Sequence, residues 1–367
     1  MANLLFQTYI APYRIDTYNA LHEKTGMQFY FLYTQHGMQK FDMASLYSQC
    51  NFKPKFLRTI SLFSKYYKIC TNIWSILKEE KPEIVIVPEF KILTLQVLLH
   101  KYIFFKRYKV ISMCDDSYDM VANDHDFSKI HKFSRQIVVP FLDNLLLVDS
   151  RVAKWYKNRY HKGIWLPIIR DEKKEAPLYE NVIHLSKDLS DRFNLNLRKV
   201  LLFVGRLDPV KNLETLFKAI SITTEDFVTV IVGDGELESQ LKQQASEMTK
   251  PIVFAGRYEG DGVRAWYNIA DVFVLASKQE AYGAVTNEAL IAGVPCIISE
   301  NAGSACLINE TNGLVINPYD IDSMAQTLNE IMKKVVVKEK MTARPSKMPF
   351  TFNDILDRTI SQMISYK

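Results

Sequence analysis

Short, continuously apolar segments alternate with longer helix-like segments along nearly the whole chain. Runs such as Ile84-Val-Ile-Val87 and Val200-Leu-Leu-Phe-Val204 contain no polar residue, as is typical of strands that helices cover on both faces. This alternation predicts right-handed βαβ units, and therefore parallel sheets in an α/β fold. Strands are predicted near residues 3–7, 28–33, 84–88, 109–113, 144–148, 163–166, 199–204, 228–232, 252–254, 271–275, 294–298 and 313–316. Helices are predicted near residues 14–25, 62–79, 91–105, 127–140, 150–160, 212–222, 236–248, 263–269, 284–292 and 321–334.

The chain is too long for one hydrophobic core. Single cores stop growing at roughly 250–300 residues, and this chain has 367, which predicts two domains. The boundary is placed near Pro167-Ile-Ile-Arg170, because the charged segment over residues 171–175 that follows is poor in core residues. We therefore expect one domain over residues 1–168 and a second over residues 169–349.

Two glutamates are separated by seven residues in the segment Glu280-Ala-Tyr-Gly-Ala-Val-Thr-Asn-Glu288. The segment follows a strand-like run that ends at Ser277 and leads into a helix that ends before Gly293. Both carboxylates are therefore expected at the carboxyl end of a strand, where open α/β sheets bind ligands. The start of the helix also offers free N–H groups to an anion.

This pattern resembles the E-x7-E signature of retaining glycosyltransferases with the GT-B fold, most closely glycosyltransferase family 4. The resemblance is specific over residues 199–334, where four further segments match in order and spacing. They are Phe203-Val-Gly-Arg-Leu-Asp-Pro-Val-Lys-Asn212, Val232-Gly-Asp-Gly235, Ile252-Val-Phe-Ala-Gly256 and Ala289-Leu-Ile-Ala-Gly-Val-Pro295. The resemblance implies two Rossmann-like domains with parallel sheets facing across a cleft. It further implies that the first domain binds the acceptor, the second binds a nucleotide sugar, and a final helix within 350–367 packs back on the first.

The loop after the predicted strand at 199–204 brings two cations together. Gly205 allows a ligand to approach the backbone closely, and the resemblance implies that Arg206 and Lys211 contact the donor diphosphate. Stabilising the charge that develops on such a leaving group is usually the largest catalytic term. The alternative is a solvated turn between a strand and a helix. Because these cations would do the work of a divalent ion, we expect no essential metal and no other cofactor.

The two glutamates are expected to hold the rest of the donor. The resemblance implies that Glu280 contacts donor-sugar hydroxyls and helps to stabilise positive charge at the anomeric carbon, and that Glu288 accepts hydrogen bonds from the ribose. The backbone N–H groups of Gly283, Ala284 and Val285 would face the distal phosphate. Alternatively, Glu280 complements the helix dipole and Glu288 is a solvated helix residue.

Two further turns are expected near the nucleotide. Gly233 begins a Gly-Asp-Gly turn from strand to helix, which could equally be an ordinary turn. By resemblance, the base rests near Gly256 and Arg257, at the end of the next strand. Residue types do not distinguish the bases, and a UDP- or GDP-linked sugar is the expected donor.

The first half departs from the family pattern. Many members have a glycine-rich loop after the first strand, whereas the loop over residues 8–16 has no glycine. Its Pro-Tyr-Arg sequence resembles that of bacterial surface-polysaccharide transferases, which makes Tyr13 and Arg14 candidate acceptor-binding residues. Arg14 could face an acceptor phosphate or the donor diphosphate. The alternative is a surface arginine at a helix start.

Two aspartates stand where family members tend to carry a histidine. Asp115 and Asp116 follow the predicted strand at 109–113. A carboxylate there can hydrogen-bond a sugar hydroxyl or receive the acceptor proton, so both are candidate catalytic residues. A histidine-based mechanism is in doubt, but the departing phosphate can itself accept that proton. The alternative is that both aspartates cap the following turn.

Charge and aromatic residues indicate a possible membrane partner. No acidic residue occurs over residues 43–78, where lysines and aromatic residues alternate, and a second basic run covers residues 101–109. Such composition suits an anionic membrane surface, the alternative being a solvated face over core aromatics. The net charge of +5 is too small to indicate a nucleic-acid partner.

The expected location is the cytoplasm, either free or peripheral at the inner face of the plasma membrane. Residues 1–10 are strand-like and lack the features of a signal peptide. The longest apolar stretch, residues 92–105, is too short and too polar to span a bilayer. The five cysteines show no zinc-site spacing, which fits buried or free thiols in a reducing compartment.

These features predict a retaining, hexosyltransferase-type glycosyltransferase. Its expected acceptor is a glycan or lipid-linked glycan in capsule, O-antigen or exopolysaccharide biosynthesis. A nucleotide-sugar epimerase on the same fold, and a non-catalytic nucleotide-sugar-binding protein, are the alternatives. No G-x-G-x-x-G follows a strand and no G-x-x-x-x-G-K-[ST] occurs, which disfavours a dinucleotide oxidoreductase and a P-loop phosphotransferase.

Overall fold

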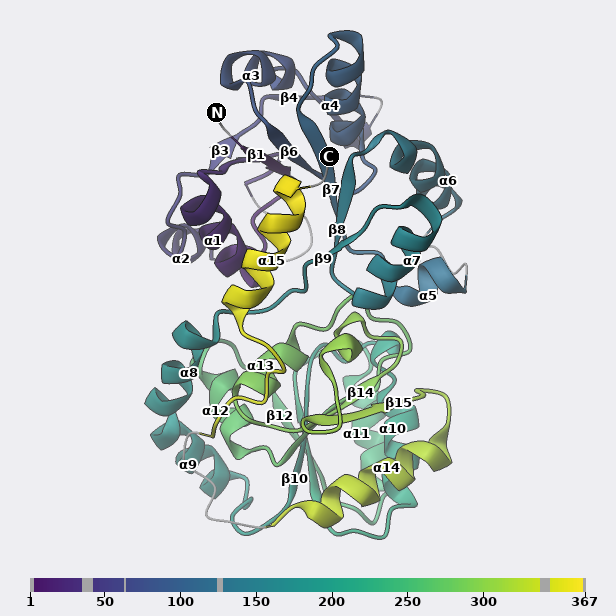
Figure 1. Cartoon of the computed structure of the whole chain (residues 1–367). Coiled ribbons are helices and arrows are strands. Elements are labelled where there is room, and N and C mark those ends of the chain that lie inside the picture. The colour runs from purple at the N-terminus through teal and green to yellow at the C-terminus, as the bar shows by residue number, and fades with distance from the viewer. Residues whose placement is uncertain (1–2, 35–41, 63, 124–127, 337–343, 366–367) are drawn as a thin grey trace. The chain divides into compact units, whose positions relative to one another are not determined.

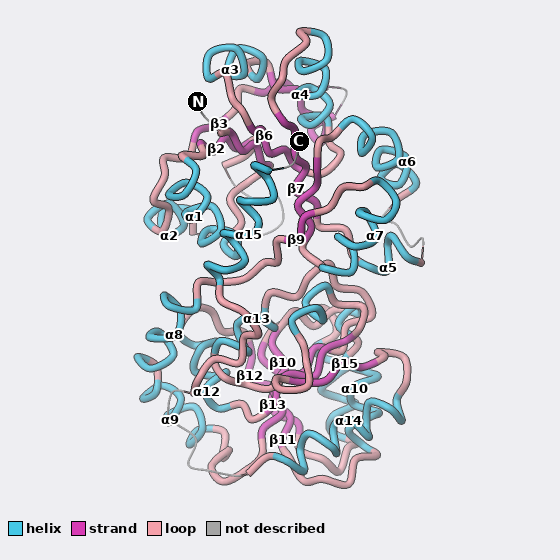
Figure 2. The backbone as a smooth tube through the Cα atoms, in the orientation of Figure 1, coloured by secondary structure: helices cyan, strands magenta, loops and turns pink. Residues whose placement is uncertain are grey.

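The computed structural model describes residues 3–34, 42–62, 64–123, 128–336 and 344–365, without the side chains of residues 62 and 64–67. The chain divides into two compact units, Met1–Ile169 with Asn353–Lys367, and Arg170–Phe352. In each, the strands lie at the centre and helices lie outside them (Figures 1 and 2).

The N-terminal unit contains a seven-stranded sheet in the order β3-β2-β1-β6-β7-β8-β9, with every pair parallel. Its strands are β1 (Leu4–Gln7), β2 (Gln28–Phe31), β3 (Lys55–Phe56), β6 (Ile84–Pro88), β7 (Lys109–Cys114), β8 (Asn144–Leu147) and β9 (Ile164–Trp165). Its helices are α1 (Ile15–Thr25), α2 (Met43–Ser48), α3 (Ile73–Glu80), α4 (Ile92–Ile103), α5 (Tyr118–Ala122), α6 (Lys129–Val138), α7 (Ser150–Tyr160) and α15 (Phe352–Ser365). Strand order reverses between β1 and β6, which creates the crevice where such sheets bind ligands.

The C-terminal unit contains a six-stranded parallel sheet in the order β12-β11-β10-β13-β14-β15. Its strands are β10 (Val200–Val204), β11 (Val228–Val232), β12 (Ile252–Gly256), β13 (Val272–Leu275), β14 (Cys296–Ser299) and β15 (Gly313–Ile316). Its helices are α8 (Glu172–Asn181), α9 (Ile183–Arg192), α10 (Leu213–Ser221), α11 (Glu238–Ser246), α12 (Asp261–Ile269), α13 (Val285–Ile291) and α14 (Ile321–Lys334). This is the Rossmann order, with its reversal between β10 and β13.

The predicted apolar runs form the central strands because helices exclude water from both faces. Every residue of β6 and β10 is buried, which removes strongly apolar side chains from water. The prediction of two Rossmann-like domains with parallel sheets is confirmed. The last helix, α15, belongs to the N-terminal unit, where the Thr359 hydroxyl donates to the Trp165 carbonyl oxygen at 3.3 Å.

The predicted helix over residues 62–79 is wrong in its first part. The antiparallel pair β4 (Thr59–Leu62) and β5 (Ser64–Cys70) occupies this region, and only α3 is helical. Threonine, isoleucine and tyrosine favour strands, and the antiparallel partner β4 supplies the backbone hydrogen bonds that a strand cannot make by itself. The Gln96 amide also exchanges two hydrogen bonds, of 3.0 and 2.8 Å, with the backbone of Cys70.

Two helices, α8 and α9, occupy a segment for which no helix was predicted. The Asp171 side chain caps α8 by accepting a hydrogen bond from the Lys173 N–H at 3.1 Å. Buried Glu175 forms ion pairs with Arg170 at 2.5 Å and with Arg264 of α12 at 3.3 Å. The ion pair between Glu175 and Arg264 therefore holds α8 against α12 of the same domain.

No helix among the described residues is long and apolar enough to cross a bilayer. Each of the five cysteines is a free thiol.

Candidate functional site

The loops that follow β10, β11 and β12 are joined by backbone hydrogen bonds. The Gly205 N–H donates to the Val232 carbonyl oxygen at 3.0 Å, and the Gly233 N–H donates to that of Gly256 at 2.9 Å. The Leu207 N–H donates to the Asp234 carbonyl oxygen at 2.8 Å. Three segments far apart in the sequence thus form one rigid rim at the carboxyl edge of the sheet.

Only glycine fits at the closest approach within this rim. Gly233 has φ +147°, and a Cβ atom there would lie 1.8 Å from the Gly205 carbonyl oxygen. A Cβ atom on Gly235 would lie 2.4 Å from the carbonyl oxygen of Leu207. The Gly-Asp-Gly sequence is therefore required by the packing of the two loops as well as by a turn.

Replacing Gly233 with alanine is expected to destabilise the C-terminal domain by about 3 kcal/mol, from backbone strain and an unavoidable clash. Chemical denaturation followed by circular dichroism measures this loss. The matched control is Gly256→Ala, because Gly256 also has positive φ but a Cβ atom there meets nothing within 4 Å. Equal losses in the two variants would contradict the close-approach explanation.

Asn212 connects the β10 loop (residues 205–212) to the β13 loop (residues 276–284). It adopts the left-handed conformation, with φ 61°. Its buried amide donates to the carbonyl oxygens of Ala276 at 3.1 Å and Pro318 at 2.8 Å. The Lys278 N–H also donates to the Val210 carbonyl oxygen at 2.8 Å. These hydrogen bonds fix the position of one loop relative to the other, and both loops flank the strand-order reversal.

This fixed arrangement of the two loops places the side chain of Lys211 next to that of Glu280. Their side chains form an ion pair and retain only 14% and 18% exposure. Arg206 lies nearby in the same loop but is 71% exposed, and it pairs with Asp208 at 3.1 Å. The site therefore holds one ordered cation and one exposed cation that can move to meet an anion.

The segment between the two glutamates turns sharply into α13. Gly283 has φ +88°, and a Cβ atom there would lie 2.7 Å from Leu275 and 3.3 Å from Glu280. The backbone N–H groups of Gly283, Ala284 and Val285 donate no hydrogen bond to any described residue. Three donors at the start of a helix can accept an anion.

Glu288 is half-buried in α13 and is not the solvated helix residue of the alternative interpretation. The Tyr267 hydroxyl donates to its carboxylate at 3.1 Å. Burial raises the pKa of Glu288, although the Arg170 charge and the Tyr267 hydrogen bond oppose that shift. The carboxylate can accept further hydrogen bonds, but part of its capacity is already used within the domain.

Arg257 lies on the exposed side of the rim. Its guanidinium pairs with Glu259 at 2.5 Å and lies 3.8 Å from Asp234, and the hydrogen bond that Arg257 donates to Glu259 raises the pKa of Arg257. The adjacent Gly256 has φ +83°. These residues border the edge at β12 and are open to a ligand.

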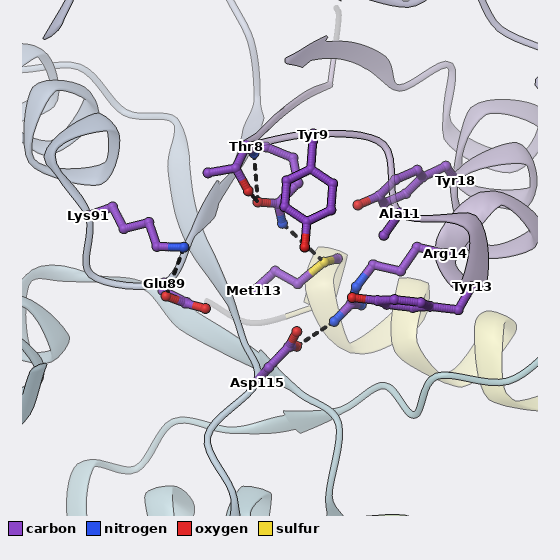
Figure 3. A pocket seen from close by; sticks show the side chains of 11 residues that line it. Thr8, Tyr9, Ala11, Tyr13, Arg14, Tyr18, Glu89, Lys91, Met113 and Asp115 are labelled. Carbon is purple, nitrogen blue, oxygen red and sulfur yellow. Dashed lines mark hydrogen bonds and ion pairs between the residues drawn. The ribbon is translucent and has the colours of Figure 1, made fainter. Parts of the chain in front are cut away.

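In the N-terminal unit, a small polar cavity of about 80 Å³ lies at the strand-order reversal (Figure 3). Arg14 is 5% exposed in its side chain and forms an ion pair with Asp115, which is 35% exposed. Arg14 is thus a buried, oriented cation and not a surface arginine at a helix start. The Tyr18 hydroxyl lies at this cavity and has no hydrogen-bond partner among the described residues. Desolvation raises the pKa of Tyr13, so its hydroxyl remains a donor.

Asp116 is arranged quite differently from its neighbour. It is 1% exposed and accepts hydrogen bonds from Tyr156 at 2.5 Å, His131 at 2.9 Å and Arg135 at 3.3 Å. Burial alone would raise the pKa of Asp116, but the hydrogen bonds from His131 and Tyr156 and the charges of His131 and Arg135 lower it. Its carboxylate is occupied by these partners, whereas Asp115 faces the cavity.

Sequence reasoning missed Asn212, Tyr267 and Arg170 as parts of the site. Asparagine is enriched in the left-handed conformation, so Asn212 after a Pro-Val-Lys turn could have been found. Tyr267 and Arg170 lie far from Glu288 in the sequence, and no local pattern connects them. Among the described residues, no three His, Cys, Asp or Glu side chains are grouped as metal ligands.

Residues 188–347 match the model of the family described as glycosyl transferases group 1. The chain is 30% identical over 211 residues to an α-1,4-N-acetyl-D-galactosaminyltransferase of Campylobacter jejuni named for a diNAcBac-PP-undecaprenol-linked acceptor, covering 56% of this chain and 54% of that protein. It is 38% identical over 138 residues to an Escherichia coli UDP-Gal:α-D-GlcNAc-diphosphoundecaprenol α-1,3-galactosyltransferase, covering 35% of each. The chain spans 36%, 54% and 27% of the first three curated relatives.

Solved structures resemble the whole chain. A lipopolysaccharide outer core galactosyltransferase, WaaB, matches with a TM-score of 0.69 at 18% identity and covers 99% of both chains. Anabaena HepE in complex with UDP and glucose matches with a TM-score of 0.69 at 16% identity and covers 100% of both. At these identities the likeness concerns the fold.

Proposed function

We propose that this chain, which has the GT-B fold and whose residues 188–347 match the family model of glycosyl transferases group 1, is a retaining glycosyltransferase of the family-4 kind. Its donor is a UDP- or GDP-linked sugar, and its acceptor is a glycan carried on a lipid phosphate. Relatives named for undecaprenol-linked acceptors support the acceptor class. The C-terminal domain holds the donor and the N-terminal domain holds the acceptor.

The ion pair between Lys211 and Glu280 is the observation that carries the proposal. A lysine and a glutamate from two different loops meet at the strand-order reversal, with both side chains largely buried. When a donor binds, Lys211 faces the diphosphate oxygens and Glu280 turns to the donor-sugar hydroxyls. Exposed Arg206 adds the second positive charge.

The reaction breaks the bond between the anomeric carbon and the diphosphate oxygen. The acceptor hydroxyl oxygen bonds the same carbon from the same face, and its proton passes to the departing phosphate or to Asp115. Lys211, Arg206 and the N–H groups of residues 283–285 stabilise the negative charge that develops on the diphosphate. This arrangement supplies the charge without an essential metal ion. Glu288 accepts hydrogen bonds from the ribose, and Gly256 and Arg257 border the base.

The polar cavity of the N-terminal domain is the proposed glycan acceptor site. Tyr13, Tyr18 and the Arg14–Asp115 pair surround it. The unpartnered Tyr18 hydroxyl can donate to or accept from a sugar hydroxyl, which would satisfy a buried polar group. Asp116, whose carboxylate is fully engaged, orients this region without touching a substrate.

Nucleotide binding tests the donor site. One of UDP, GDP, ADP and CDP is expected to raise the thermal midpoint of the whole chain by a few degrees, because a ligand at a hundred times its dissociation constant stabilises by about 2.7 kcal/mol. A panel of nucleotide sugars with that base then identifies the sugar. Turnover of a donor to an epimer without any acceptor would instead indicate the epimerase alternative, and no shift with any nucleotide would contradict the proposal.

A further inference from the structure

A second and larger cavity lies in the N-terminal domain. Its volume is about 520 Å³, which falls within the roughly 300–1,000 Å³ of small-molecule sites. Hydrocarbon side chains from the ends of β2 and β6 and from α4 and α6 form much of its wall. They are Leu32, Phe90, Ile92, Leu93, Leu95 and Ile130.

This apolar cavity adjoins the polar cavity of the proposed acceptor site. Thr8, Glu89 and Lys91 line both of them. In Figure 3, Lys91 and Glu89 lie on the opposite side of the polar cavity from Arg14. Lys91 pairs with Glu89 at 3.1 Å, and Lys68 reaches the apolar cavity over the ring of Tyr33, 4.3 Å from its centroid. Lys91 and Glu89 therefore lie where the apolar cavity meets the polar one, and Lys68 lines the apolar cavity beside them.

The two helices beside the cavity leave apolar stripes exposed. On α6, Ile130 is 71% exposed, Phe133 63% and Ile137 46%, at the helical spacing of one face. On α4, exposed apolar residues follow one another at the same kind of spacing: Leu95, Leu99, Tyr102 and Ile103. Phe105, just beyond α4, is 91% exposed. Exposed apolar residues gathered in this way mark an interaction surface.

The charge of the segments around α4 and α6 indicates which kind of partner binds this apolar surface. Residues 90–114 and 127–142, which contain α4 and α6, include no Asp or Glu but eight Lys or Arg residues. They are Lys91, Lys101, Lys106, Arg107, Lys109, Lys129, Lys132 and Arg135. Two of them, Lys101 and Arg135, are largely buried in ion pairs with Asp143 and Asp116, so the other six carry the charge of this surface. Helices that are apolar on one face and basic elsewhere suit an anionic lipid surface. The sequence prediction assigned this property to residues 43–78 and to the basic run over residues 101–109. The exposed apolar residues lie on α4, which overlaps that second run, and on α6.

We propose that the 520 Å³ cavity between α4 and α6 binds the hydrocarbon chain of a lipid diphosphate. This inference rests on the proposed function, since the lipid is the carrier of the acceptor glycan. The glycan occupies the polar cavity beside Arg14 and Asp115, Lys91 and Lys68 face the phosphates, and the chain passes between the helices toward the membrane. One amphipathic ligand thus accounts for the adjoining polar and apolar cavities and for the uncovered stripes.

Isothermal titration of the whole chain with inorganic diphosphate, geranyl diphosphate and farnesyl diphosphate tests the proposal. Affinity is expected to rise with chain length, at least tenfold from geranyl to farnesyl diphosphate, because each added methylene group leaves water. The variant Ile130→Asp is expected to weaken farnesyl diphosphate binding at least tenfold. Ile130 is exposed enough for the charge to leave the core intact.

Two controls separate the cavity from other sites. Phe105→Asp changes the same surface but does not line the cavity, so it should reduce binding to phosphatidylglycerol vesicles and leave farnesyl diphosphate binding unchanged. The Lys211→Ala variant should also bind farnesyl diphosphate with unchanged affinity. That result would exclude binding of the diphosphate group of the probe at the donor site.

Equal affinities for inorganic and farnesyl diphosphate, or an unaltered Ile130→Asp variant, would overturn the cavity assignment. In that case, a nucleotide-induced thermal shift in the same preparation would show that the proposed donor site does not depend on the assignment of the lipid cavity. Lipid binding without any nucleotide shift would support the cavity and count against the donor site.

Discussion

Transfer by the Lys211→Ala variant is expected to fall about 100- to 1,000-fold, the loss typical of removing one oriented group that stabilises developing charge. Lys211 is the ordered cation of the donor site, and its ion pair with Glu280 fixes its position. The measurement is release of nucleoside diphosphate in the presence of acceptor. The nucleotide-induced thermal shift should disappear with the activity.

The control for Lys211→Ala is Lys218→Ala. Lys218 is exposed on α10, seven residues further along, and lies outside the site. Both variants should keep the circular dichroism spectrum of the wild type. Unchanged transfer by Lys211→Ala, or equal losses in the two variants, would contradict the diphosphate assignment.

The Asp116→Ala variant is expected to lose about 3–5 kcal/mol of unfolding free energy, because breaking a buried ion pair leaves an uncompensated charge. Arg135, which is 4% exposed, would lose the Asp116 carboxylate, and the buried Tyr156 hydroxyl would lose its acceptor. Chemical denaturation of the whole chain measures the loss. Asp357→Ala, in an exposed pair with Lys24 in the same domain, should cost no more than about 1 kcal/mol.

The pH dependence gives a second readout for Asp116. Its folded-state pKa is lowered, so the ionised form stabilises the fold at every pH above the unfolded value of roughly 3.9. That contribution declines as pH falls below this value and through the folded pKa. His131 contacts Asp116, and histidine changes its charge between about pH 5 and 8, so the comparison is made below that range. The stability difference between wild type and Asp116→Asn should narrow as pH falls below about 4, and a difference that grows there would contradict the assigned charge state.

The C-terminal domain was largely predictable because its signals are local. Each strand there is a short apolar run, most of the loops at the carboxyl ends of the strands contain glycine or proline, and α14 begins and ends where the pattern predicts, at Ile321 and Lys334. In the N-terminal domain, the segment over β4 and β5 was misassigned. In the structure β5 pairs with β4, and the Gln96 side chain bonds the backbone of Cys70 at its end. Such contacts between separate elements produce no periodic pattern in the sequence of the segment itself.

The candidate site divides in the same way. Spacing and residue type sufficed to select Lys211, Glu280 and Arg14. They did not distinguish Asp115 from Asp116, because two adjacent residues of the same type have the same local sequence context. The structure separates them: one faces a cavity, while the other is enclosed by His131 and Tyr156.

The sequence by itself determined the order of most strands and helices, the number of domains and the residues that bear charge at the strand ends, since each follows from local composition and length. Only the tertiary structure decided which of those charges meet. The Lys211–Glu280 and Arg14–Asp115 pairs join residues 69 and 101 positions apart. Such pairs exist because a parallel sheet brings the carboxyl ends of distant strands to one edge, where burial fixes the partner of each charge.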